Sequence, residues 1–476
     1  MFTKNQLITS IYSHFPHTPN EEQASLIESL SEFTIDFQAK SCFILKGYAG
    51  TGKTTLLGAY IRALHEQKLD TVLLAPTGRA AKVLSQRSQN YASTIHKRIY
   101  FAGPDATGAI RLNLAPNKAK NTIFIVDEAS MIGDLSLQSD GRISRNLLED
   151  LFQYVYSGTH CKLILLGDEG QLPPVGQEES PALNTNYLSH CFSGIDFYVY
   201  GLTEVVRQQK ESGILENATR IRTAQKTGQQ PQIDLHSFKD FKLIPGDELI
   251  SSLESDYDNF CADEVMIVTR SNKRANLYNQ HIRNRILYME EELCGGDLLM
   301  VVKNNYYWLD PLSPAGFIAN GELVKVHRVK KVEELYEVRF VHLEVSLIDY
   351  PEMERFECIA FLDTLTLESP NLNREFTKKL FFEIEKDFLH ERNKQKRYQE
   401  ITKSPYFNAL QIKFAYAVTC HKSQGGQWAS VYVDHGFIEP EQIDLSFLRW
   451  LYTATTRATE KLNFVGLLED FIEEKE

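Results

Sequence analysis

The sequence predicts an α/β protein with two parallel-sheet cores, a small hairpin insertion in the first core and a β-rich insertion in the second. Short apolar runs alternate with helical segments in residues 1–202, and the alternation returns after residue 203. Residues 295–407 interrupt this second stretch, and there apolar and polar residues alternate as in β-strands. Alternating strands and helices are typical of parallel sheets covered by helices, so two such stretches predict two cores.

The first core is expected to span residues 1–202. Its apolar runs are typical of buried strands and lie at 41–46, 71–75, 122–126, 162–166 and 197–200. After the first run, apolar residues recur at helical spacing, at Leu56, Leu57, Tyr60, Ile61 and Leu64. The rhythm breaks between Arg98 and Leu114, where turn residues separate two stretches that can pair. We therefore expect a β-hairpin insertion at about residues 97–120.

The second core is expected from two separate stretches, residues 203–294 and 408–476. Buried-strand runs lie at Val265–Val268 and Ser430–Val433, and helices are predicted around Ala275–Ile286 and leading into Leu451. The same pattern on both sides of a different one indicates a core interrupted by an inserted domain.

The insertion is expected to occupy residues 295–407. Tyr336 to Phe340 alternate as in a strand, and a long charged helix is predicted from about Arg374 to Tyr398. The insertion should therefore combine a β-rich domain with a helical arm.

The composition of the 476-residue chain is that of a globular protein, with 43% hydrophobic and 24% charged residues. A net charge of -12 argues against a protein that coats nucleic acid by bulk attraction, although a local basic channel remains compatible with it. Seven scattered cysteines without a Cys-x-x-Cys pair predict neither a disulfide framework nor a zinc site. Without a membrane-length apolar run or a secretion signal, we expect a cytoplasmic protein with no membrane contact.

Residues Gly47 to Thr54 fit the phosphate-binding pattern G-x-x-x-x-G-K-[ST]. The motif lies between an apolar strand and a helix, which argues against a chance glycine-rich turn. Backbone amides at the helix start should hold phosphate, Lys53 should reach the β and γ phosphates, and the Thr54 hydroxyl should bind Mg²⁺. The residues expected to hold ATP here are Gly47, Ala49, Gly50, Thr51, Gly52, Lys53, Thr54 and Thr55.

A second nucleotide motif runs from Ile123 to Glu128, a buried strand that ends in two carboxylates. Parallel sheets bind ligands at this end of their strands. Asp127 is expected to hold the Mg²⁺, and Glu128 to act as general base on the attacking water. By itself the pattern is weak, but together with the upstream phosphate loop it predicts an NTPase.

Further motifs make the chain resemble a known family. Leu165 to Gly176 places Gly-Asp after a strand, followed by Gln171 and a Pro-Pro turn. Other segments match the same family in order, namely Asn20–Gln23, Ala75–Ala81, Thr94–His96, Leu202–Gln208, Val418–Gly425 and Leu451–Ala458. Each alone could be a surface loop or a helix face. In this order, over most of residues 20–465, they resemble the RecD-like and Dda-like, five-prime to three-prime branch of helicase superfamily one.

The resemblance implies two RecA-like P-loop NTPase cores with ATP between them, and a small β-barrel in the insertion. It implies that Gln23 reads the adenine edge, that Gln171 touches the γ phosphate, and that Gly425 lies near the nucleotide. Arg207 and Arg457 are expected to stabilise charge on the transferred phosphate, since arginine stays charged. Catalysis would thus depend on Lys53, Asp127, Glu128, Gln171, Arg207 and Arg457. The implied DNA contacts are Pro76, Thr77, Gly78, Arg79, His96, Thr419, His421 and Ser423.

The function implied is that of an ATP-dependent DNA helicase that moves five-prime to three-prime on single-stranded DNA, with the hairpin as a wedge at the fork. Expected partners are single-stranded DNA, duplex forks and other repair or recombination proteins, and the chain is expected to act as a monomer. RNA remains open as a track. Two alternatives also remain: an NTPase that remodels nucleoprotein without unwinding, and a motor subunit of a larger recombination complex.

Overall fold

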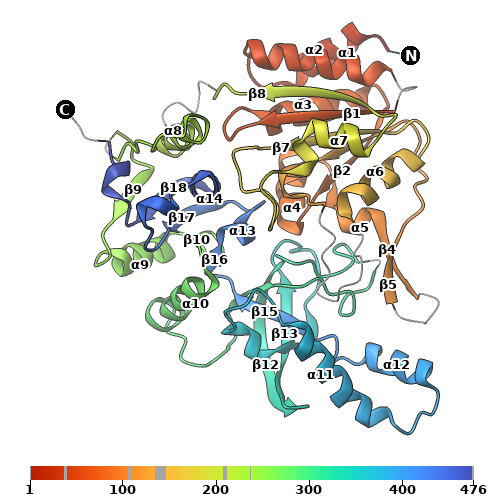
Figure 1. Ribbon diagram of the computed structural model, residues 1–476, viewed down its shortest axis with the longest axis vertical. Helices are drawn as coiled ribbons and strands as arrows, with labels where there is room; N and C mark the ends of the chain where they lie inside the picture. Colours follow the sequence, from red (N-terminus) through yellow and green to blue (C-terminus); the bar gives the residue numbers. More distant parts are fainter. Residues whose placement is uncertain are drawn as a thin grey trace.

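The computed structural model describes residues 2–36, 40–104, 110–134, 146–206, 212–235, 237–311 and 313–473. Within them the chain forms two parallel sheets flanked by helices and a closed barrel (Figure 1). The α/β class with two RecA-like cores is therefore confirmed. None of the helices in these ranges is long and apolar enough to span a membrane.

The first sheet has the strand order β3-β2-β6-β7-β1-β8, with every pair parallel. Its strands are β1 (Ser41–Gly47), β2 (Asp70–Ala75), β3 (Ala92–Thr94), β6 (Thr122–Val126), β7 (Lys162–Gly167) and β8 (Asp196–Leu202). Its helices are α1 (Lys4–His14), α2 (Glu21–Ile35), α3 (Lys53–Glu66), α4 (Gly78–Ser88), α6 (Leu147–Ser157) and α7 (Thr185–Cys191). In β1, Phe43 and Leu45 pack into one hydrophobic cluster and Cys42 and Ile44 into another. Alternate residues therefore bury both faces of the sheet, as expected for a parallel sheet between helix layers.

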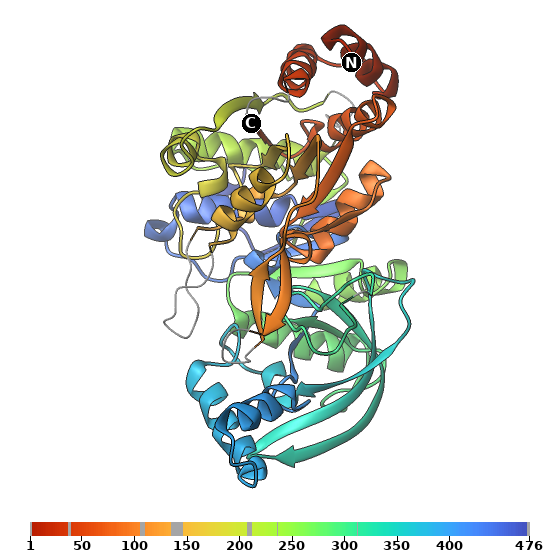
Figure 2. The same cartoon turned by 90° about the vertical axis from the view of Figure 1, so that its right-hand side faces the viewer.

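The predicted hairpin is present. A short helix, α5 (Ile95–Ile99), leads into β4 (Tyr100–Pro104), which pairs antiparallel with β5 (Ile110–Leu114). The hairpin extends from the first core toward the barrel in both views (Figures 1 and 2). At its base, Lys97 Nζ donates to the carbonyl oxygen of Ser313 at 3.3 Å, so the hairpin region contacts the insertion directly.

The second sheet has the order β16-β10-β17-β18-β9. Its strands are β9 (Phe241–Ile244), β10 (Val265–Thr269), β16 (Ala417–Thr419), β17 (Trp428–Asp434) and β18 (Ala458–Val465). Its helices are α8 (Gly213–Thr227), α9 (Leu249–Asn259), α10 (Asn272–His281), α13 (Cys420–Ser423) and α14 (Leu445–Thr455). A π-helical turn, Ile282–Ile286, continues α10, so the predicted helical segment changes its winding at its end.

The insertion contains a closed barrel of β11 (Leu298–Val301), β12 (Leu323–Leu335), β13 (Val338–Leu347), β14 (Phe356–Phe361) and β15 (Leu410–Phe414). Two details differ from expectation. Tyr336 and Glu337 form the turn between β12 and β13, with φ of 56° and 59°, instead of continuing a strand. Strand β15 follows residue 407 yet belongs to the barrel, because it pairs with both β11 and β14 and closes the cylinder.

The prediction of one long charged helix from about Arg374 to Tyr398 is wrong. The chain forms two helices here, α11 (Arg374–Glu385) and α12 (Lys394–Lys403). The side chain of Asn393 caps the start of α12 by accepting from the amide of Gln395 at 2.9 Å. Ile384 of α11 and Ile401 of α12 are both fully buried in one apolar cluster against the barrel. A straight helix would separate these two side chains, so burial of both favours the break.

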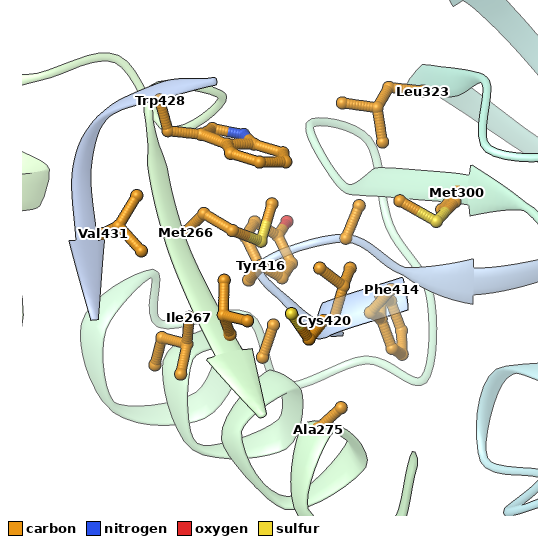
Figure 3. Packing of buried hydrophobic residues seen from close by; sticks show 14 of the residues in the cluster. Met266, Ile267, Ala275, Met300, Leu323, Phe414, Tyr416, Cys420, Trp428 and Val431 are labelled. Carbon is orange, nitrogen blue, oxygen red and sulfur yellow. The ribbon is translucent and has the colours of Figure 1, made fainter. Parts of the chain in front are cut away.

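The second sheet and the barrel share one continuous hydrophobic core (Figure 3). Tyr416 lies between Met266 of the sheet and Phe414 of the barrel, and the two aromatic ring centroids are 6.5 Å apart. The Tyr416 hydroxyl accepts from the amide of Leu298 and donates to Asp297, both at 3.1 Å. We therefore expect the barrel and the second core to behave as one rigid body.

Candidate active site between the two cores

A cavity of about 450 Å³ lies between the two sheets. From the first core it is lined by Ala49, Gly50, Gly52, Lys53, Thr54, Thr55, Asp127, Glu128 and Gln171, and from the second by Gly425 and Arg457. The structure thus brings together most of the residues predicted from the sequence to act on a nucleotide.

The phosphate loop connects β1 to α3. Gly50 and Gly52 adopt φ of 77° and 81°, a left-handed backbone that favours glycine. A Cβ on Gly52 would lie 2.7 Å from Nε2 of Gln23, and this amide group donates to the carbonyl of Thr51 at 3.1 Å. Gln23 therefore lies against the loop, next to the cavity. Lys53 Nζ donates to the carbonyl of Tyr48 at 2.9 Å and to that of Gly47.

The paired carboxylates stand at the end of β6. Asp127 Oδ1 accepts from the amide of Glu128 at 2.9 Å, and Glu128 has φ of 52°, an uncommon left-handed backbone for this residue type. Burial raises the pKa of both carboxyl groups, and the nearby Lys53 opposes that rise. Buried carboxylates of this kind need cations to stay ionised. The oxygen ligands of Thr54 and Asp127 are the type that Mg²⁺ prefers, so the site fits this ion.

The segment after β7 carries Gln171. Asp168 Oδ1 accepts from the amide of Gly170 at 2.9 Å and forms a tight turn before the glutamine. Gln171 is 7% exposed, and its Oε1 has no partner within the described part of the chain. A buried amide oxygen without a partner is costly, so its position at the cavity wall indicates a place for a ligand.

Of the two predicted arginines, the structure describes Arg457, whereas Arg207 lies outside the described residues. Arg457 follows α14 and is 3% exposed. Its Nε donates to the carbonyl of Thr453 at 2.9 Å. Its positive charge lowers the pKa of Glu128 and so opposes the rise that burial causes. A positive charge from the second core therefore lies near enough to act on Glu128, while Nη1 and Nη2 donate to Gly426 and Thr456 of its own core.

The first predicted DNA motif lies at the start of α4, after the half-buried Pro76. The Thr77 hydroxyl caps this helix by accepting from the amide of Ala80 at 3.2 Å. Arg79 faces the second core, because its guanidinium lies 4.2 Å from the ring centroid of Trp428 and donates to the carbonyl of Gln427 at 2.9 Å. Arg79 therefore joins the two cores, and its guanidinium is already used in contacts within the fold.

The remaining predicted DNA residues differ in accessibility. Thr419 is half-buried and His421 is exposed. Ser423 is fully buried and donates to the carbonyl of Cys420 at 2.8 Å, so its hydroxyl is already used within the fold. Burial lowers the pKa of His96 to about 4, which leaves its ring uncharged near neutral pH. Neither Ser423 nor a charged His96 is therefore expected to hold a phosphate.

Two lysines that the sequence analysis did not select lie beside Thr419. Lys413 and Lys422 line one small pocket with it. Lys422 Nζ is buried without a partner among the described residues. Burial, together with the charge of Lys413, lowers its pKa to about 8. Lys422 stands inside a recognised motif, whereas Lys413 lies in a barrel strand and carries no local sequence signal.

Gly78 contacts the barrel closely. A Cβ at this position would lie 1.9 Å from Oε1 of Glu322, whose carboxylate is buried and has one oxygen without a partner among the described residues. Burial and the nearby Asp349 raise the pKa of Glu322 to about 8, although Lys82 opposes the shift. The Glu322 side chain therefore favours its protonated form at this contact between α4 and the barrel.

Replacing Glu322 with Gln is expected to remove a loss of stability that develops between pH 4.5 and 8. The folded-state pKa of about 8 lies above the ordinary 4.5. The stability that the protonated Glu322 carboxyl group contributes is therefore fully present below pH 4.5 and is lost as the pH rises from 4.5 to 8. Thermal unfolding across this pH range should show a flatter profile for the variant and a higher melting temperature above pH 8. The exposed Glu460, changed to Gln, should keep the wild-type profile. An unchanged pH profile in the Glu322 variant would contradict this account.

Comparisons with known proteins agree with this architecture. Residues 18–237 match a family model described as an AAA domain, and residues 414–465 match a UvrD-like helicase C-terminal domain. The ATP-dependent DNA helicase dda of Enterobacteria phage T4 is 30% identical over 296 residues, which cover 59% of this chain and 62% of that protein. The ATP-dependent RecD2 DNA helicase of Deinococcus radiodurans is 33% identical over 156 residues, 33% of this chain and 18% of that protein.

A solved structure of two coordinating Pif1 helicases at forked double-stranded DNA has 16% identity and a TM-score of 0.48, covering 96% of this chain and 95% of that chain. The matched segments span less than two thirds of the phage T4 and Deinococcus helicases. The two family models lie on the two cores, and they include the phosphate loop of the first and Arg457 of the second. The family matches and the helicase relatives therefore make the two cores similar to those of superfamily 1B P-loop helicases.

Proposed function

We propose that the protein is an ATP-dependent DNA helicase that moves along single-stranded DNA and separates duplex strands. The observation that carries this proposal is the cavity between the cores, where Lys53, Glu128 and Gln171 face Arg457. Since the two sides of the cavity belong to different cores, hydrolysis depends on how the cores approach each other. Closing and opening of such a cleft is the ordinary way to convert hydrolysis into domain movement.

Each residue has a role that follows from its chemistry. Lys53 holds the β and γ phosphates, and Glu128 takes a proton from the attacking water. Arg457 stabilises negative charge on the transferred phosphoryl group, and Gln171 orients the γ phosphate or the water. A Mg²⁺ ion held by Thr54 and Asp127 would neutralise phosphate charge when bound. Arg207 remains a proposed second arginine.

The proposed DNA path crosses both cores. Thr77 at the start of α4 and Thr419 at the end of β16 stand as the contacts that alternate during each cycle. A Gly425 Cβ would lie 2.9 Å from Thr77 Oγ1, so the two motifs meet close to the cavity. Lys422, beside Thr419, supplies positive charge for the phosphate backbone. The hairpin β4–β5 is proposed as the wedge at the fork, and single-stranded DNA and duplex forks are the proposed partners.

Replacing Lys422 with Ala is expected to weaken single-stranded DNA binding to a similar degree for all sequences. Loss of one phosphate contact should reduce the slope of log affinity against log salt by about one. Fluorescence anisotropy with two oligonucleotides of different sequence, at several salt concentrations, measures both effects. The exposed Lys242, changed to Ala, is the control. Unchanged affinity and slope would exclude Lys422 from the DNA path.

The direction of movement, five-prime to three-prime, is proposed from the resemblance to the RecD-like branch. The function is tested first by ATP hydrolysis with and without a single-stranded oligonucleotide, and by strand separation of a forked duplex. Hydrolysis that DNA stimulates, together with strand separation, supports the helicase. Stimulated hydrolysis without strand separation would instead favour a remodeller or a motor subunit of a larger complex. Absence of any hydrolysis would refute both.

A further inference from the structure

Tyr452 reaches from the second core into the first, where it contacts Ala49 and Asp168, two residues that line the nucleotide cavity. It lies in α14, is 1% exposed, and packs against Gly170, where a Cβ would lie 3.0 Å from the tyrosine ring. Its hydroxyl accepts from the amide of Ala49 at 2.9 Å and donates to Asp168 Oδ2 at 2.8 Å. One hydroxyl group therefore connects the phosphate loop to the turn that precedes Gln171.

Other side chains of the second core hold the same turn. The amide of Leu172 donates to Thr453 Oγ1 at 2.8 Å, and Gln225 Nε2 donates to the carbonyl of Gly170 at 3.0 Å. Gln171 lies between these two anchored positions, and its own side-chain oxygen has no partner within the described ranges. The second core thus fixes the backbone on both sides of Gln171.

We propose that Tyr452 is a positioning residue for ATP hydrolysis. Its hydroxyl keeps Ala49 and Asp168 in fixed relative positions, so that the phosphate loop and Gln171 are aligned on the same γ phosphate. Tyr452 touches no reacting atom and acts through these two residues. Because it belongs to the second core, movement of that core is transmitted to Gln171. This inference rests on the proposed function.

The test uses Tyr452→Phe in the full chain, which removes the hydroxyl and keeps the ring. The Ala49 amide and the buried Asp168 carboxylate each lose a partner, and the turn is free to shift. We expect kcat for ATP hydrolysis to fall about tenfold, with KM and the affinity for a fluorescent ADP within about twofold of wild type.

Tyr416→Phe is the matched control. Tyr416 is also fully buried, and its hydroxyl also accepts from one amide and donates to one aspartate, at Leu298 and Asp297. It lies at the junction of the barrel and the second sheet, away from the cavity lining. Both variants should lose similar thermal stability, but only Tyr452→Phe should lose kcat.

A double variant with Asp168→Asn tests the route of action. If Tyr452 acts through Asp168, the double variant will lose little more kcat than the more affected single variant. A wild-type kcat in Tyr452→Phe, or an equal loss in Tyr416→Phe, would overturn the inference. So would full additivity in the double variant. Wild-type hydrolysis in the same assay tests the proposed function separately, and its absence would reject both.

Discussion

Replacing Lys53 with Ala is expected to reduce ATP hydrolysis by about 10²- to 10³-fold and to abolish strand separation. Lys53 is the cation of the phosphate loop, and its charge also counteracts the rise in pKa that burial imposes on Asp127 and Glu128. The variant therefore loses a phosphate contact and one of the charges that oppose the raised pKa of Glu128. Steady-state phosphate release measures the effect.

The matched control is Lys242→Ala, which removes an exposed lysine from the edge strand β9 of the second sheet. It should hydrolyse ATP at the wild-type rate. Hydrolysis by Lys53→Ala within about threefold of wild type would contradict the assignment of the nucleotide site, since a transition-state contact of this kind is worth far more.

Replacing Arg457 with Ala is expected to reduce hydrolysis by about 10³-fold while nucleotide binding is largely retained. The phosphate loop that binds ATP lies in the first core, whereas Arg457 comes from the second and faces Glu128 across the cavity. Its loss should therefore affect the transition state far more than the ground state. Phosphate release and the affinity for a fluorescent ADP, measured together, separate the two effects.

Arg285→Ala is the control for this prediction. Arg285 also belongs to the second core, but it is exposed and lines a cavity that shares no residue with the nucleotide cavity. Near-normal hydrolysis is expected. An equal loss of nucleotide affinity and hydrolysis in Arg457→Ala would show that the arginine is structural and would refute its proposed role.

Local patterns in the sequence predicted the elements that depend on neighbouring residues. The buried strand before Gly47, the left-handed glycines Gly50 and Gly52, and the apolar strand before Asp127 are all specified within a few residues. Periodicity and backbone preference are properties of short windows, and this is why the strands that were predicted lie close to their observed bounds, whereas β3, β9, β16 and β18 were not predicted.

Contacts between distant segments could not be predicted in this way. The stacking of Arg79 on Trp428, the contact of Gly78 with Glu322 and the closure of the barrel by β15 each join residues far apart in the chain. The break between α11 and α12 likewise depends on burial of Ile384 and Ile401 against the barrel. The local sequence pattern alone favoured one long charged helix, and tertiary burial overrode it.

The measurement that tests the central claim most directly compares two fluorescent partial duplexes, one with a five-prime and one with a three-prime single-stranded tail. Strand separation is followed with ATP and Mg²⁺ for wild type and Lys53→Ala. We predict that wild type opens only the five-prime-tailed duplex and that the variant opens neither. If wild type opens neither while DNA still stimulates ATP hydrolysis, the helicase assignment is contradicted and the remodeller takes its place.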